Sequence, residues 1–250
     1  MIDRTVGVAG GRLEVWCDGG AGPAVVFLAA IGGDDTLRPI AERLAERANV
    51  CFYVRPGDGD AESPNGPRTA AQDAADLHQL LDVAEIASPV VLVGHSYGGL
   101  IAVVETARHP QAVAGVVLID ASHPEQEARF ASIFTPEQQA ISDAELDNFP
   151  SVDFAASLAE AGTALGSFPD VPLTVITARR GFAEACDDGL PCEAMQEIWL
   201  ALQDAYAALT PDARHVVADT GHYVHDEEPD LVLAEIEGML GRVTTAAPPP

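Results

Sequence analysis

The sequence predicts an α/β fold in which parallel β-α units are interrupted once by a helical insert. Short apolar runs alternate with helix-patterned stretches up to residue 119, and this alternation is typical of parallel β-α units. Residues 122–169 contain no strand pattern, and the strand-helix alternation resumes at residue 171. A strand-poor insert within such a sheet is expected to form a cap over the functional site.

The elements before the insert follow from the spacing of apolar residues. The run at residues 24–29 is continuously apolar, as expected of a buried parallel strand. The stretch at residues 36–48 predicts a helix, because its apolar residues recur at helical spacing. Further strands are expected at residues 12–17, 50–54, 90–93 and 114–119, further helices at residues 69–84 and 97–108, and a loop rich in glycine and proline at residues 55–67.

The segment after the insert completes the predicted architecture, with strands at residues 171–177 and 214–218 and helices at residues 192–209 and 229–240. We therefore divide the chain into an α/β core of residues 1–121 and 170–243, a cap of residues 122–169, and a tail of residues 244–250. The tail ends in three prolines and is expected to be disordered.

The charge balance is strongly acidic: 39 acidic and 13 basic residues give a net charge of −26, and every basic residue is arginine. Such a polyanion repels nucleic acids and anionic lipids, so neither is an expected partner. Two explanations of the acidity stay open, adaptation to high salt and the codon usage of a GC-rich genome. No apolar run is long enough to span a bilayer, and the N-terminus lacks the apolar core of a signal peptide. A cytoplasmic protein that acts on a small molecule is therefore expected.

The four cysteines do not indicate a metal site. Cys17 and Cys51 lie in apolar, strand-like stretches and are expected to be buried thiols. Cys186 and Cys192 bracket a loop short enough for a disulfide, although free thiols are favoured without an export signal. The sequence has no histidine-cysteine cluster at ligand spacing, no phosphate loop and no dinucleotide fingerprint, so neither a metal nor a cofactor is expected.

The strongest functional signal is the sequence GHSYGG at residues 94–99. It follows an apolar strand and precedes a helix pattern, and this context makes Ser96 the candidate nucleophile. A serine on such a tight turn has a strained backbone and stands above the sheet edge, at the positive end of a helix. Gly94 and Gly98 leave space for the turn, because side chains there would collide with adjacent elements. The alternative is a glycine-rich turn that only binds a ligand.

Three stretches carry a resemblance to a known family. They are PVVLVGHSYGGLIAVVETARHPQAVAGVVLIDASHPEQ at residues 89–126, RPGDG at residues 55–59, and GHY at residues 221–223. Over nearly its whole length the chain resembles the α/β-hydrolase superfamily, and the first stretch resembles its esterase-type members. The resemblance implies a mostly parallel, doubly wound sheet flanked by helices, with a cap inserted after the strand that ends at Ile119.

A serine nucleophile needs a base, and His222 is the best candidate among seven histidines. It follows the strand at residues 214–218, and catalytic groups cluster at that end of parallel strands. It also comes last along the chain, as the order serine, acid, histidine requires. His225 is the competitor, interpreted as a rim or structural residue, and His95 is interpreted as structural. The role of His123 stays open.

The acid that orients the histidine has two candidate positions. Most members of the α/β-hydrolase superfamily carry this acid after the strand that corresponds to residues 171–177 of this chain. The acids near that position here are Asp187 and Asp188. A second known placement follows the preceding strand, where Asp120 comes directly after Ile119. Asp120 is favoured, because an acid close to a strand end is held rigidly against the histidine.

Stabilising an oxyanion requires two fixed donors, usually backbone N–H groups. The resemblance implies that Tyr97, which follows the nucleophile, supplies one of them, and that the loop after the strand at residues 24–29 supplies the other. Ile31 is our choice in that loop. Many relatives carry His-Gly where this chain has Ala29 and Ala30, and the alternative is a plain strand-helix turn.

Together these residues predict a serine hydrolase that cleaves a carboxylic ester, lactone or related acyl bond by two-step acyl transfer. The alternative, which the same resemblance offers, is a protein that binds a small ligand with little or no turnover. Aromatic residues of the cap favour a partly apolar substrate, although each is equally well explained as core. These residues are Phe130, Phe134, Phe149 and Phe154, with Trp199 from a later helix.

Overall fold

The computed structural model of the chain describes residues 2–20, 22–32, 35–58, 64, 66–146, 148–182 and 189–246. Within these residues the strands form one sheet in the order β1-β2-β4-β3-β5-β6-β7-β8. β1 and β2 pair in antiparallel fashion, as do β2 and β4, and the remaining neighbours are parallel. This confirms the predicted α/β class. The strands are β1 (Ile2–Val8), β2 (Gly11–Asp18), β3 (Ala24–Leu28), β4 (Asn49–Val54), β5 (Val90–His95), β6 (Val113–Ile119), β7 (Leu173–Ala178) and β8 (Arg214–Ala218).

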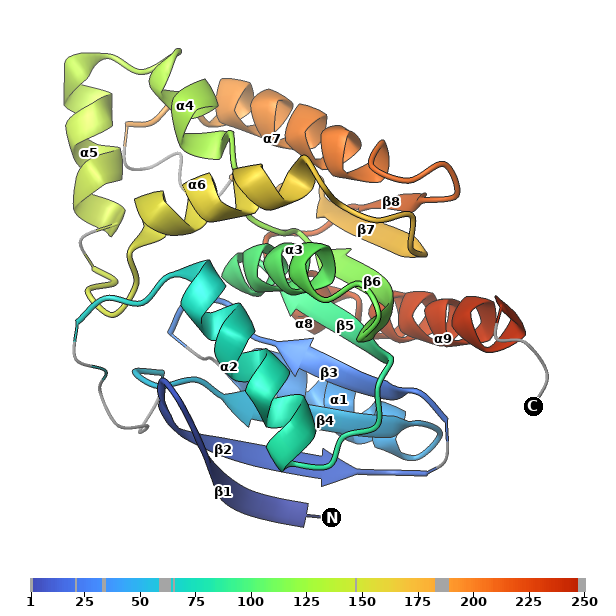
Figure 1. Cartoon of the computed structure of the whole chain (residues 1–250). Helices are drawn as coiled ribbons and strands as arrows, with labels where there is room; N and C mark the ends of the chain where they lie inside the picture. Colours follow the sequence, from blue (N-terminus) through green and yellow to red (C-terminus); the bar gives the residue numbers. More distant parts are fainter. Residues whose placement is uncertain are drawn as a thin grey trace.

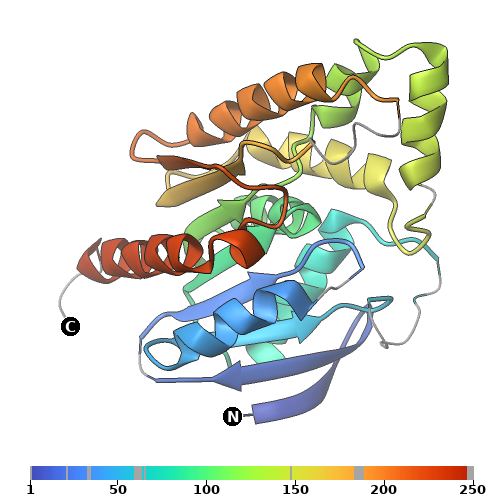
Figure 2. The same ribbon diagram turned by 180° about the vertical axis from the view of Figure 1, so that it is seen from behind.

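Helices cover both faces of the sheet. Figure 1 shows one face with α2 (Ala70–Val83), α3 (Tyr97–Arg108) and α6 (Phe154–Leu165). Figure 2 shows the opposite face with α1 (Arg38–Ala45) and α9 (Pro229–Ala246). The other α-helices are α4 (Gln126–Ala131), α5 (Pro136–Leu146), α7 (Cys192–Ala207) and the short α8 (Val224–Glu227). Helices α4, α5 and α7 lie near the top of Figure 1.

The apolar core is divided by the sheet, because successive strand residues point to opposite faces. On β3, Val26 and Leu28 pack in the cluster that contains α2 and α3. Val25 and Phe27 pack in the cluster that contains α1 and α9. All of β3 is buried, which explains why its sequence is a continuous apolar run.

β1 is the one strand of the described sheet that the sequence analysis does not predict. It forms a hairpin with β2, in which Val8 pairs with Gly11. As an edge strand it contributes only partly buried apolar side chains, Val6 and Val8, to the core. Two such residues give too weak a pattern to predict a strand.

The insert after β6 consists of α4, α5 and α6, but these helices do not form one layer. α6 packs in the same cluster as α2 and α3, through Leu158 and Ala161. α5 has no buried residue, and Phe130 of α4 packs with Trp199 of α7 in a separate small cluster. We call α4, α5 and α7 the roof. The roof differs from the predicted cap of residues 122–169, because α3 buries the apolar face of α6.

The expectation of buried thiols at Cys17 and Cys51 is wrong, because the two residues form a disulfide with Cα atoms 4.2 Å apart. β2 is antiparallel to β4, and the register places Cys17 directly opposite Cys51. This register depends on strand pairing, which neither local pattern contains. Cys192 is also disulfide-bonded, against the preference for a free thiol, and Cys186 lies outside the described residues.

Helix α9 continues to Ala246, so the first part of the predicted disordered tail, residues 244–246, is helical. The buried Val243 anchors this turn, and the hydroxyl of Thr244 donates to the carbonyl of Leu240. Residues 247–250 lie outside the described residues. None of the described helices is both long and apolar enough to cross a membrane.

Candidate functional site

Four of the predicted site residues follow strands of the parallel part of the sheet. Ile31 follows β3, Ser96 follows β5, Asp120 follows β6 and His222 follows β8. The carboxyl ends of these strands meet at one edge. β3 lies between β4 and β5, so the chain order reverses there, and loops that diverge at such a point leave a crevice.

Ser96 occupies a strained turn between β5 and α3. Its φ of 51° and ψ of −119° lie outside the regions that a residue with a side chain ordinarily adopts. Between residues 90 and 106 it is the only residue that is not buried. Its N–H donates to the carbonyl of Ile119, and its carbonyl accepts from the N–H groups of Gly99 and Ser122. The surrounding structure thus fixes the turn and leaves the serine accessible.

Close packing explains the glycines around this turn. A Cβ atom at Gly94 would lie 2.6 Å from the carbonyl oxygen of Gly98. A Cβ atom at Gly98 would lie 2.1 Å from the carbonyl oxygen of Leu28 on β3. Both obstacles are backbone atoms, so neither position accepts a side chain without movement of the turn.

His222 and Asp120 form a hydrogen bond, with 2.6 Å between His222 Nδ1 and Asp120 Oδ2. The carboxylate oxygen accepts, so Nδ1 carries the proton and Nε2 is left free to accept one. Asp120 is almost fully buried, whereas the side chain of His222 is one-third exposed. This is the geometry of an acid that orients a histidine base.

Two further donors fix the carboxylate of Asp120. Its Oδ1 accepts from the N–H of Ala178 at 2.9 Å and from the indole N–H of Trp199 at 2.7 Å. The backbone of Asp120 has a φ of 41°, which is uncommon for a residue with a side chain. Its N–H donates to the carbonyl of Ile176 at the end of β7. The position directly after β6 therefore fixes this carboxylate beside His222, and the role of Asp120 as the acid of the site stays a prediction.

The other histidines have structural surroundings. His95 is fully buried and donates from Nε2 to the backbone carbonyl of His222, at 3.2 Å. Burial lowers the pKa of His95 well below its usual value, which favours the neutral form of this ring. His225 is buried and bonds the hydroxyl of Thr36 at 2.7 Å. Neither His225 nor His123 lines the cavity around Ser96.

A cavity of about 370 Å³ contains Ile31, Ser96, Asp120 and His222 in its lining. Most of its walls are apolar, and the roof supplies many of them. Phe134 is not in the lining and stacks on Phe130 instead, with 6.2 Å between the ring centroids. The aromatic lining residues are Phe130, Phe149, Phe154, Phe182, Trp199 and Tyr223.

Two carboxylates of the roof, Glu127 and Glu145, also face this cavity, and its described lining contains no arginine. Burial raises the pKa of Glu127, although a hydrogen bond from Gln126 opposes the shift. Among the described residues that line the cavity, no arginine is therefore available to pair with an anionic substrate.

The two predicted oxyanion donors, the N–H groups of Ile31 and Tyr97, lie in different structural settings. Ile31 lines the cavity, and within the described residues its N–H makes no backbone hydrogen bond. Tyr97 is the first residue of α3, where N–H groups have no acceptor within the helix. The side chain of Tyr97 is buried away from solvent, and its hydroxyl donates to Asp73 Oδ2 at 3.1 Å.

One group of described side chains brings possible metal ligands together. The ligand atoms of His78, Glu105 and His109 lie within 4.8 Å of one another. The two imidazole rings are stacked, with centroids 3.6 Å apart and planes at 12°. The free nitrogen lone pair of an imidazole lies in the ring plane, so two nearly parallel rings at this spacing do not both aim at one ion. The arrangement therefore does not fit a metal ion.

The sequence analysis missed two features of this site. It treated Trp199 only as an apolar wall, whereas the indole N–H bonds Asp120, and it did not identify the carboxylates of Glu127 and Glu145. Both features depend on how the roof packs over the sheet edge, which no local pattern contains. The alternative acids, Asp187 and Asp188, lie outside the described residues.

Comparison with known proteins gives a match over most of the chain and shorter matches over part of it. The uncharacterised protein YqjL of Bacillus subtilis is 25% identical over 235 residues, which are 92% of this chain and 88% of YqjL. The putative carbamate hydrolase RutD of Azorhizobium caulinodans is 31% identical over 102 residues, 40% of this chain and 38% of RutD.

Solved structures share the fold. The enol-lactonase from Burkholderia xenovorans LB400 superposes with a TM-score of 0.67 at 22% identity, covering 95% of this chain and 100% of that one. Est816, described as an N-acyl homoserine lactone degrading enzyme, gives a TM-score of 0.65 at 21% identity, covering 94% and 99%. The model of the alpha/beta hydrolase family matches residues 19–235. The chain therefore belongs to the alpha/beta hydrolase family.

Proposed function

We propose that this protein is a serine hydrolase that cleaves a carboxylic ester, lactone or related acyl bond of a small, partly apolar substrate. The observation that carries the proposal is the 2.6 Å bond between His222 and Asp120, beside a serine held on a strained turn in the same cavity. This combination activates a hydroxyl that is otherwise a poor nucleophile.

The reaction proceeds in two steps. Ser96 Oγ attacks the acyl carbon while His222 Nε2 takes the hydroxyl proton, and the N–H groups of Ile31 and Tyr97 stabilise the oxyanion. The bond to the leaving group breaks, and His222 returns the proton to the departing oxygen. Water then attacks the acyl-serine in the same way and releases the acid.

The cavity favours uncharged or cationic substrates. Its aromatic walls fit an apolar portion, and the carboxylates of Glu127 and Glu145 repel an anionic group. The likeness to Est816 and to the enol-lactonase supports lactones as one substrate class, and the likeness to the putative carbamate hydrolase RutD supports carbamates as a related acyl bond.

The test is hydrolysis of p-nitrophenyl acetate and butyrate, together with release of acid from neutral lactones. We expect turnover in the wild type and loss of about 10⁴-fold or more in Ser96→Ala. Ser122→Ala is the matched control, because Ser122 lines the same cavity but does not occupy the strained turn. Equal activity of Ser96→Ala and wild type would refute the proposal, whereas ligand binding without turnover would support the binding-protein alternative.

A further inference from the structure

Arg55 lies directly behind the loop that carries Ile31. Its Nη1 donates to the carbonyl of Ala29 at 2.7 Å, and its Nη2 donates to the carbonyl of Ala30 at 2.5 Å. The guanidinium is buried, so these contacts are shielded from water. One side chain thus holds two successive peptide groups at the end of β3.

The contact with Ala30 determines where the next N–H points. In a trans peptide group, the carbonyl and the following N–H point in opposite directions. The carbonyl of Ala30 points to Arg55, so the N–H of Ile31 points away from it. Ile31 lines the cavity together with Ser96, which is the side where an oxyanion would form.

Asp58, the ion-pair partner of Arg55, contacts the loop on the C-terminal side of Ile31. Asp58 Oδ2 lies 2.7 Å from Arg55 Nη2, and both side chains are about 95% buried. Burial raises the pKa of Asp58, and the neighbouring Arg55 and the hydrogen bond from the N–H of Gly32 oppose this shift. The ion pair therefore contacts the loop both before and after Ile31.

The same guanidinium also contacts Tyr97, which carries the second donor. Its central carbon lies 5.3 Å from the centroid of the Tyr97 ring, within the range of a cation–π interaction. Asp73 accepts from the hydroxyl of Tyr97 at 3.1 Å, and its Oδ2 lies 4.0 Å from Arg55 Nε. One buried charge cluster thus contacts the peptide groups on either side of Ile31 and the side chain of Tyr97, the two residues predicted to supply the oxyanion donors.

We propose that Arg55 is a positioning residue for the oxyanion hole, which fixes the N–H of Ile31 and the start of α3 relative to each other. This inference rests on the proposed function. Arg55 does not contact the substrate; it acts through the Ala30–Ile31 peptide group and the Tyr97 ring. Lysine cannot replace it, because a single ammonium lacks the planar pair of N–H donors that reaches both carbonyls.

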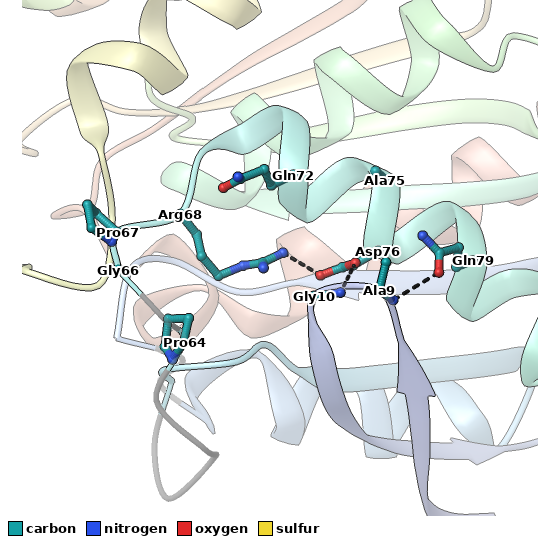
Figure 3. Close-up of a pocket in the computed structure, with 10 residues that line it drawn as sticks. All are labelled: Ala9, Gly10, Pro64, Gly66, Pro67, Arg68, Gln72, Ala75, Asp76 and Gln79. Carbon is teal, nitrogen blue, oxygen red and sulfur yellow. Dashed lines mark hydrogen bonds and ion pairs between the residues drawn. The ribbon is translucent and has the colours of Figure 1, made fainter.

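Arg68 provides a matched control in the same charge cluster. Its Nε bonds Asp73 at 2.7 Å and its Nη2 bonds Asp76, and it is about as buried as Arg55. Figure 3 shows Arg68 reaching Asp76, beside the N–H of Gly10 in the β1–β2 hairpin. Among the described residues, Arg68 makes no hydrogen bond to the carbonyl of Ala29 or Ala30, and Arg55 makes both. Loss of Arg68 therefore removes a buried charge without releasing the oxyanion loop.

The kinetic test compares Arg55→Lys and Arg55→Gln with Arg68→Lys and Arg68→Gln, using ester turnover per titrated active site. We expect the Arg55 variants to lose about 10²–10³-fold in kcat with KM changed by less than about threefold, as for a lost oxyanion donor. The Arg68 variants should melt at lower temperature but keep kcat within about threefold. Equal kcat losses in both pairs, or full kcat in a folded Arg55 variant, would overturn the proposal.

A second measurement does not depend on turnover. Hydrogen exchange of the peptide covering residues 29–32 should accelerate in Arg55→Lys and stay unchanged in Arg68→Lys. Unchanged exchange in Arg55→Lys would overturn the proposal even if the protein hydrolyses esters. Accelerated exchange in a protein without ester turnover would support the loop contact and refute only the proposed function. If the Arg55 variants do not fold, Asp58→Asn replaces them, because it keeps the side-chain volume. This variant should show a smaller loss of kcat and a smaller acceleration of hydrogen exchange at residues 29–32.

Discussion

The two sides of the cavity around Ser96 are built differently. On the sheet side, every residue from 90 to 106 except Ser96 is buried, and the carboxylate of Asp120 accepts three hydrogen bonds. On the roof side, α5 has no buried residue and Phe149 is 40% exposed. The sheet side therefore has one fixed geometry, whereas the roof offers mainly apolar contact and charge.

Under the proposed function, this difference separates the groups that carry out the chemical step from those that select the substrate. Groups that must be placed within a fraction of an ångström lie on strand ends, where backbone hydrogen bonds hold them. Groups that only need to exclude water or repel a charge lie on the roof, and sequence changes in its helix α5, which has no buried residue, should cost little stability. Substitutions on the sheet side should therefore reduce turnover strongly, and substitutions on the roof should mainly change which substrate is preferred.

The largest effect is expected for Asp120→Asn. Oδ1 accepts from both Ala178 and Trp199, so the amide oxygen will occupy that position and the NH₂ group will face His222. A donor there favours the wrong tautomer of the histidine, and kcat should fall by about 10⁴-fold. Steady-state kinetics with p-nitrophenyl butyrate and a melting curve measure the two consequences separately.

The control for this prediction is the double variant Asp187→Asn with Asp188→Asn, which should keep its activity. An inactive double variant beside an active Asp120→Asn would assign the acid to the later loop instead.

A smaller effect is expected for Trp199→Phe, which links the roof to the sheet side. The substitution keeps the aromatic wall but removes the 2.7 Å hydrogen bond to Asp120. Since a hydrogen bond to a charged group contributes about 1.5–3 kcal/mol, kcat should fall by about 10- to 150-fold. Trp16→Phe is the matched control, because Trp16 is buried and its indole N–H has no hydrogen-bond partner among the described residues. The prediction fails if both variants lose the same activity.

A still smaller effect, on selectivity alone, is expected for Glu127→Gln. Removing this carboxylate should lower the preference for an aminoalkyl ester over a carboxyalkyl ester by a few-fold, and added salt should reduce the difference. The measurement is the ratio of kcat/KM for the two esters at low and high ionic strength. Glu125→Gln, two residues earlier and outside the cavity lining, should leave the ratio unchanged. An unchanged ratio in Glu127→Gln would show that the roof does not select by charge.

No effect on turnover is expected for Glu105→Gln, at the end of α3 remote from Ser96. Burial raises the pKa of Glu105 to about 7, although a hydrogen bond from His78 opposes the shift. A carboxyl whose pKa is raised on folding loses its contribution to stability as the pH rises from about 4.5 to about 7. Glu105→Gln should therefore melt above the wild type at pH 8, with the gain vanishing near pH 4.5. A gain that is the same at both pH values would contradict this role of burial.

The parts of the fold that the sequence predicts are those with local signals. The apolar run of β3, the helical spacing of α1 and the glycines around Ser96 each carry their information within a few residues. The position of Asp120 directly behind Ile119 is also local, which is why the sequence can identify it as a candidate acid.

The missed features all depend on contacts between distant segments. The disulfide of Cys17 and Cys51 needs the register of β2 on β4, and the bond from Trp199 to Asp120 joins residues 79 positions apart. The contacts of Arg55 likewise join one loop to the end of β3. Composition and periodicity describe single segments, so they predict which elements form but not which side chains meet between them.

The most direct measurement is the site of labelling by a fluorophosphonate, which reacts with an activated serine as an ester does. Intact mass and peptide mapping of the wild type should show one adduct per chain, on the peptide that contains Ser96. The adduct should be absent from Ser96→Ala and should form much more slowly in His222→Ala. A wild type that stays unlabelled, or an adduct that persists in Ser96→Ala, would contradict the assignment of Ser96 as the nucleophile.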